Sequence, residues 1–117
     1  MPKSVLIVDD NPNMASLLSE MMEIFDFTSE RAGDGDEALE KLEKTKFSIV
    51  ISDMRMPNMT GLELLDHVKE KYPKVPVVII SGYAMKDETS PSGLHPDGFL
   101  SKPFLMTDIE QLLNSLL

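Results

Sequence analysis

Four short polar stretches of the chain contain residue types suited to phosphoryl chemistry. Asp9 and Asp10 follow one apolar run, Asp53 follows a second, Ser81 ends a third and Lys102 follows a fourth. Three carboxylates in one place repel one another, and each tends to keep a proton unless a cation lies among them. A hard divalent ion with oxygen ligands removes that conflict. Mg²⁺ (or Mn²⁺) is the natural candidate, because it is usually held by one or two carboxylates together with waters and phosphate oxygens.

The same residues predict a division of chemical roles. With a metal ion present, the ionised Asp53 carboxylate could act as a nucleophile toward phosphorus and form an acyl phosphate. The Lys102 ammonium group would balance charge on the phosphoryl oxygens, and the Ser81 hydroxyl could donate to one of them. Each residue taken singly has an ordinary explanation, such as a helix cap, a turn or a surface lysine. Their joint placement is what favours a functional site.

The elements that would bring these residues together alternate along the chain. Short β-branched runs typical of buried strands occupy 5–8, 47–51 and 75–80, and weaker candidates occupy 28–32 and 98–101. Apolar residues at helical spacing predict helices at 14–25, 38–42, 62–72 and 109–116. Asn11 is the predicted cap of the first helix, with Pro12 in its first turn. Thr107 or Asp108 is the predicted cap of the last.

This alternation predicts a single α/β domain over residues 1–117. We expect a flavodoxin-like, doubly wound, five-stranded parallel sheet in the order 2-1-3-4-5, because that order puts the least apolar strands at the edges. Ligands of such sheets gather at the carboxyl ends of the strands, near the point where strand order reverses. The four polar stretches should therefore face one crevice.

The segment 85–97 departs from the helical pattern. Pro91 would clash with the preceding helical turn, and Ser92, Gly93 and Pro96 discourage a new helix. We therefore expect the fourth helix to be short, about one turn near 86–90, or to be replaced by a loop.

Composition excludes several classes of protein. The net charge of −9, from 11 basic and 20 acidic residues, disfavours direct binding of nucleic acid. The absence of cysteine removes disulfides and thiolate chemistry. The apolar runs are too short to span a membrane, so we expect no membrane contact and a cytoplasmic location.

The ordered motifs resemble those of response-regulator receiver domains in two-component signalling, over almost the whole chain. They are Val8-Asp9-Asp10, then Ser52-Asp53-Met54-Arg55-Met56-Pro57 with Gly61, then Ile80-Ser81-Gly82-Tyr83-Ala84, and finally Gly98-Phe99-Leu100-Ser101-Lys102-Pro103-Phe104. Any one of these motifs is a weak signal, but the ordered set at these separations is highly specific.

The resemblance implies that Asp53 accepts a phosphoryl group from the phosphohistidine of a sensor histidine kinase or a phosphotransfer protein. Asp10 and Asp53 would bind the metal ion directly, Asp9 would reach it through water, and the Arg55 backbone carbonyl would complete the protein ligands. Lys102 would contact the phosphoryl group. Such a domain catalyses its own phosphorylation and dephosphorylation without being a conventional enzyme.

Conformational signalling is also implied by the resemblance. Ser81 and Phe99 match the family's switch pair, in which the hydroxyl turns toward the phosphoryl group and the ring moves inward. An output domain or a partner protein would read this change. The Lys102–Pro103 peptide bond is expected to be cis. Arg55 and Tyr83 occupy positions that tune hydrolysis in the family, and their size predicts a long-lived phosphoryl group.

Three other functions remain as alternatives. The serious rival is a receiver-fold interaction module that signals without phosphorylation. An aspartate-nucleophile phosphohydrolase would need a second acid two residues beyond Asp53, where this chain has Arg55. A flavin-binding protein of this fold would need a phosphate loop after the first strand, where Asp9 and Asp10 would repel a phosphate.

Overall fold

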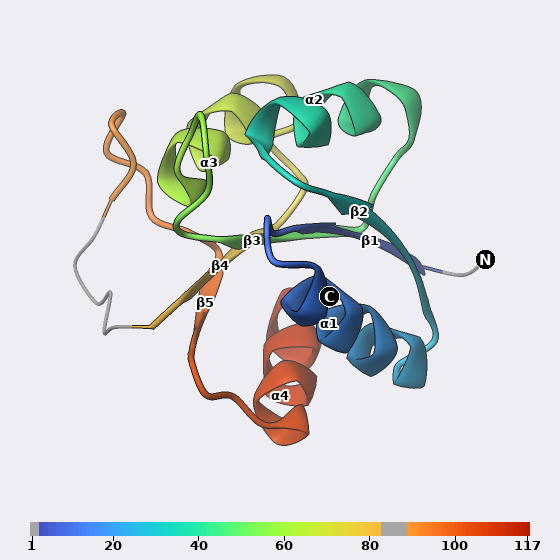
Figure 1. Cartoon of the computed structure of the whole chain (residues 1–117). Helices are drawn as coiled ribbons and strands as arrows, with labels where there is room; N and C mark the ends of the chain where they lie inside the picture. The colour runs from blue at the N-terminus through green and yellow to red at the C-terminus, as the bar shows by residue number, and fades with distance from the viewer. Residues whose placement is uncertain (1–2, 83–88) are drawn as a thin grey trace.

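The fold is a five-stranded parallel sheet between two layers of helices. The computed structural model describes residues 3–82 and 89–117. The strand order is β2-β1-β3-β4-β5, which confirms the predicted order, and every neighbouring pair is parallel (Figure 1). The strands are β1 Lys3–Val8, β2 Phe27–Ala32, β3 Ile49–Asp53, β4 Val77–Ser81 and β5 Gly98–Ser101.

Four helices within the described residues cover the two faces of this sheet. They are α1 Pro12–Ile24, α2 Gly35–Lys44, α3 Gly61–Lys71 and α4 Met106–Leu116. Helices α2 and α3 lie on one face, and α1 and α4 lie on the other (Figure 1). Alternate residues of the central strands supply the two cores: Leu6 and Val50 pack toward one helical layer, Ile7 and Ile51 toward the other. Burial on both faces explains why these strands are continuously apolar.

Two predicted strands are displaced toward their carboxyl ends. The third strand was predicted at 47–51, but it begins at Ile49 and continues to Asp53, which pairs with Ile80 of β4. The fourth was predicted at 75–80, but it begins at Val77. Pro76 has no N–H to donate to a ladder, and the Val75 carbonyl accepts instead from the Lys69 ammonium group at 2.8 Å.

Of the two predicted helix caps, the cap of α1 is confirmed and the cap of α4 is wrong. The Asn11 side chain caps α1 by accepting from the backbone N–H groups of Asn13 and Met14. For α4 the predicted cap, Thr107 or Asp108, is wrong, because the helix already begins at Met106 with Leu105 in the cap position. The Asp108 carboxylate accepts from the Leu105 N–H at 2.7 Å. It therefore satisfies the helix start from the third helical position, as the acid of a capping box does.

The altered segment between β4 and β5 is partly described. Residues 83–88, which include most of the predicted helical turn at 86–90 and also Tyr83, lie outside the described residues. Residues 89–97 contain a turn and no helix, as expected for a loop. The loop closes on itself where the Ser90 N–H donates to the Leu94 carbonyl at 2.8 Å and the Leu94 N–H donates to the Ser90 hydroxyl at 3.0 Å.

Gly61, the first residue of α3, allows that helix to start against the end of β3. A Cβ atom at this position would lie 2.6 Å from the Asp53 carbonyl oxygen and 3.0 Å from the Ile79 Cδ1 atom. The Gly61 N–H donates to the Met54 carbonyl at 2.9 Å and closes the loop that follows Asp53. Glycine is required here for close approach of two backbones.

We predict that Gly61→Ala destabilises the fold by about 1–3 kcal/mol, because the added methyl group meets backbone atoms that cannot move aside. Urea unfolding measures the change. Gly33→Ala is the matched control, since a Cβ there makes only an ordinary contact of 3.5 Å with Glu37. Equal stability of both variants would contradict this account of Gly61.

Candidate functional site

The polar residues singled out above lie together at the carboxyl edge of the sheet. Asp9 directly follows β1, Asp53 ends β3, Ser81 ends β4 and Lys102 directly follows β5. Carboxylate oxygens of Asp9, Asp10 and Asp53 lie within 4.8 Å of one another. These positions follow from topology, because β1 and β3 are neighbours in the sheet and Val8 pairs with Ser52.

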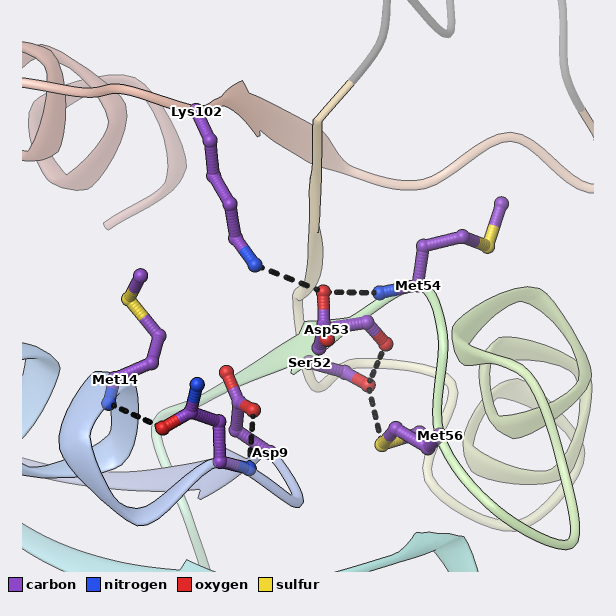
Figure 2. A network of polar contacts seen from close by, with 8 residues as sticks. Asp9, Met14, Ser52, Asp53, Met54, Met56 and Lys102 are labelled. Carbon is purple, nitrogen blue, oxygen red and sulfur yellow. Dashed lines mark hydrogen bonds and ion pairs between the residues drawn. The ribbon is translucent and has the colours of Figure 1, made fainter.

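Asp53 is fixed by its own strand end and by Lys102. Its Oδ1 atom accepts from the Met54 N–H at 3.0 Å and from the Lys102 Nζ atom at 3.5 Å (Figure 2). The Asp53 side chain is 14% exposed, so it is shielded and yet reachable from solvent. Lys102 is held in turn by its N–H, which donates to the Ser81 carbonyl at 2.8 Å. The Lys102–Pro103 peptide bond is cis, as expected.

Asp9 is the most buried of the three acids, with 5% of its surface exposed. Its Oδ1 atom accepts from the Asn11 N–H at 2.9 Å, whereas its Oδ2 atom is buried without a hydrogen-bond partner in the described part of the chain. Burial raises the pKa of the Asp9 carboxyl, and the charges of Asp53 and Asp10 raise it further against the opposing effects of Asn11 and Lys102. The described residues therefore offset only part of the cost of burying the negative charge of an ionised Asp9 carboxylate.

The donor set fits a hard divalent cation. All three side chains offer carboxylate oxygens, and the buried Asp9 Oδ2 atom has no donor among the described residues. A cation among these oxygens would favour the ionised form of Asp9, which its burial and the charges of Asp53 and Asp10 disfavour. Oxygen ligands of this kind are those that Mg²⁺ prefers.

The remaining predicted residues surround this group at different depths. Ser81 is buried, with 3% of its surface exposed. Phe99 on β5 is 41% exposed and pairs in register with Ile79 of β4. Arg55 lies exposed in the loop that follows β3.

Sequence reasoning missed Ser52, which supports the backbone of the site. The residue is fully buried, and its hydroxyl donates to the Asp53 carbonyl at 2.9 Å and lies 3.7 Å from the Met56 sulfur (Figure 2). It therefore links the end of β3 to the loop that follows. The available signal was a hydroxyl inside an otherwise apolar strand, since a buried polar group needs a partner.

The comparisons with known proteins agree with this geometry. Residues 5–114 match the family model of the response regulator receiver domain. The chain is 28% identical to the probable transcriptional regulatory protein TcrX of Mycobacterium tuberculosis over 117 residues, covering 99% of this chain and 50% of TcrX. It is 34% identical to the sensor histidine kinase RcsC of Escherichia coli over 112 residues, covering 93% of this chain and 12% of RcsC. The chain thus spans half or less of these relatives.

Solved structures show the same likeness. The chemotaxis response regulator CheY4 of Vibrio cholerae has a TM-score of 0.90 at 29% identity, and the match covers 100% of both chains. The response regulator TrrA of Thermotoga maritima, crystallised in complex with Mg²⁺–BeF, has a TM-score of 0.88 at 28% identity, with coverage of 98% of this chain and 99% of TrrA. TrrA has also been crystallised in complex with the histidine kinase ThkA, with a TM-score of 0.86 at 27% identity and coverage of 98% of both chains.

No described helix is long and apolar enough to cross a membrane.

The strand order, the acidic group at the carboxyl edge of the sheet and the match over residues 5–114 agree with one another. The chain belongs to the family of response regulator receiver domains.

Proposed function

We propose that this receiver domain takes a phosphoryl group from a phosphohistidine onto Asp53, in a reaction that requires Mg²⁺ (or Mn²⁺). The observation that carries the proposal is the position of the Asp53 carboxylate, which lies 3.5 Å from the Lys102 ammonium group and within 4.8 Å of two further carboxylates. Donors of the class proposed are a sensor histidine kinase or a phosphotransfer protein. The crystal structure of TrrA with ThkA supports this class of partner.

The proposed step exchanges one bond to phosphorus for another. An Asp53 carboxylate oxygen bonds to phosphorus while the bond from phosphorus to the imidazole nitrogen breaks. The nitrogen keeps the electron pair and solvent supplies its proton. The Lys102 ammonium group offsets charge on the transferred oxygens, and the Ser81 hydroxyl donates to one of them. Positioning and charge are the protein's main contributions to such a transfer.

The proposed metal ligands are Asp10 and Asp53 directly, Asp9 through water, and the Arg55 backbone carbonyl. When bound, the ion supplies positive charge that offsets both the carboxylates and the transferred phosphoryl oxygens. Support comes from the buried Asp9 oxygen, which accepts from no donor in residues 3–82 and 89–117, and from the Mg²⁺–BeF complex of TrrA.

Signal transmission would use the pair Ser81 and Phe99. Turning of the Ser81 hydroxyl toward the phosphoryl group would leave space that the Phe99 ring can fill. A downstream output domain or a separate partner protein would recognise the changed surface. We propose that residues 1–117 form one receiver domain and that this domain acts in the cytoplasm.

Incubation with acetyl phosphate and Mg²⁺ should add the mass of one phosphoryl group to the intact protein. We expect no adduct in Asp53→Asn, because the nucleophilic carboxylate is gone, and none when a chelator removes the metal. Asp36→Asn, an exposed aspartate on α2, should react like the wild-type protein. A folded wild-type protein that forms no adduct would instead favour an interaction module that signals without phosphorylation.

Asp9→Asn should stabilise the metal-free protein at neutral pH. The pKa of Asp9 is raised in the folded protein. Between the ordinary aspartate pKa and this raised pKa, the folded protein keeps a proton that the unfolded protein loses, so wild-type stability falls as pH rises through this range. The variant lacks this loss. Urea unfolding at several pH values should show its advantage at neutral pH and no advantage below the ordinary aspartate pKa. If Asp9→Asn is less stable than the wild-type protein at neutral pH, the pKa of Asp9 is not raised in the folded protein and this explanation is wrong.

Arg55→Ala should speed loss of the phosphoryl group several-fold, because the exposed side chain beyond Asp53 obstructs the attacking water. Tyr83→Ala, which is motivated by sequence alone, should act in the same direction. The decay of phosphorylated protein after removal of the donor measures both rates. Lys44→Ala on α2 is the control for loss of a surface cation. Decay rates equal to the control would show that these side chains do not protect the phosphoryl group.

A further inference from the structure

A groove lies between α3 and the loop 89–97, away from the acidic group at Asp53. Its volume is about 630 Å³. The α3 side contributes Asp66, Glu70 and, just beyond the helix, Pro73; the loop contributes Leu94, His95 and Asp97. Figure 1 shows the loop, in orange, running beside α3.

The loop wall of this groove is held in place by hydrogen bonds. Besides the closure of Ser90 on Leu94, the Ser92 N–H donates to the Asp66 Oδ2 atom at 3.0 Å. At the other end, Asp97 accepts from the Val77 N–H and donates its own N–H to the Val77 carbonyl. A surface fixed before binding loses less conformational entropy when a partner docks.

The charge of the groove is negative. Lys69 is its one lysine, and its charge is already compensated by Asp97, whose Oδ2 atom lies 2.7 Å from the Lys69 Nζ atom. Burial alone would raise the pKa of Asp66, but hydrogen bonds from Ser90 and Ser92 prevail and lower it, so this carboxylate stays ionised. Glu70 is exposed, and none of the ion pairs found among the described residues includes it. In Asp66 the Oδ1 atom is buried and the Oδ2 atom accepts from the Ser92 N–H, so Glu70 is the carboxylate that is more accessible to a cation.

Apolar surface accompanies these charges. Leu94 is 40% exposed although its backbone is fixed on both sides, and Pro73 is exposed across the groove. An exposed leucine on a rigid loop offers contact area without having to be ordered on binding.

We propose that the groove between α3 and the loop 89–97 binds a basic segment of a partner protein, one that places a lysine or arginine next to an apolar side chain. The cationic group would pair with the exposed Glu70, the negative charge of Asp66 in the groove lining would add attraction, and the apolar group would pack on Leu94. This binding surface is separate from phosphorylation of Asp53 and does not depend on it. Nucleic acid would be repelled by the same charges, and the three-acid arrangement suited to a metal ion occurs, among the described residues, only at Asp53.

Amide chemical shifts of the ¹⁵N-labelled full chain, titrated with a synthetic peptide, test the proposal. The probe is a ten-residue peptide with two arginines flanking a leucine in an otherwise glycine and serine background. We expect saturable shifts at Ser92, Gly93, Leu94 and Glu70. Glu70→Gln should weaken binding about twofold to fivefold, as expected for one exposed ion pair. Asp66→Asn should act similarly, since asparagine can still accept from Ser92.

Controls separate this surface from general attraction to an acidic protein. Glu40→Gln, which removes an exposed charge from α2, should leave the affinity unchanged. A peptide with glutamates in place of the arginines should not bind, and a peptide with serine in place of the leucine should bind several-fold more weakly, as should Leu94→Ser. The proposal is overturned if no saturable shift arises at these amides. It is equally overturned if Glu40→Gln weakens binding as much as Glu70→Gln, or if the peptide without leucine binds as well.

Discussion

Mutual repulsion among Asp9, Asp10 and Asp53 is the constraint on which the organisation of this domain depends. The sheet order brings these carboxylates together, since β1 and β3 are neighbours and their ends are in register at Val8 and Ser52. Lys102 compensates one charge from 3.5 Å. One buried Asp9 oxygen has no donor in the described part of the chain, so the described groups leave the repulsion only partly balanced. Such a group of acids is stable when a cation joins it.

The rest of the fold holds these groups against that repulsion. Apolar side chains on both faces of β1 and β3 fix the strands, so the acids at their ends cannot move apart freely. Gly61 lets α3 begin against the Asp53 carbonyl, and Ser52 links that carbonyl to the following loop. The rigidity that keeps the carboxylates close together despite their repulsion would also make them a preorganised site for a cation and a phosphoryl group.

Much of this arrangement could be predicted because it follows from local patterns and topology. Continuous β-branched runs identify buried parallel strands, and strand order then decides which ends meet. Single interactions were harder to predict, because an apolar pattern does not show which backbone group a nearby polar side chain will bind. The Val75 carbonyl, expected in the fourth strand, accepts from Lys69 instead, and the Asp108 carboxylate accepts from the Leu105 N–H. Ser52 was missed because its partner is the backbone of the residue already chosen for its chemistry.

If the repulsion at Asp9, Asp10 and Asp53 is relieved by a cation, Mg²⁺ must bind the folded protein more tightly than the unfolded chain. The direct measurement is the free energy of unfolding of wild-type protein and Asp10→Asn in urea, across a series of Mg²⁺ concentrations at constant ionic strength. The wild-type value should rise with the logarithm of Mg²⁺ concentration above the dissociation constant, and the Asp10→Asn value should stay nearly flat. A wild-type stability that does not depend on Mg²⁺, or an equal rise in both proteins, would contradict the account.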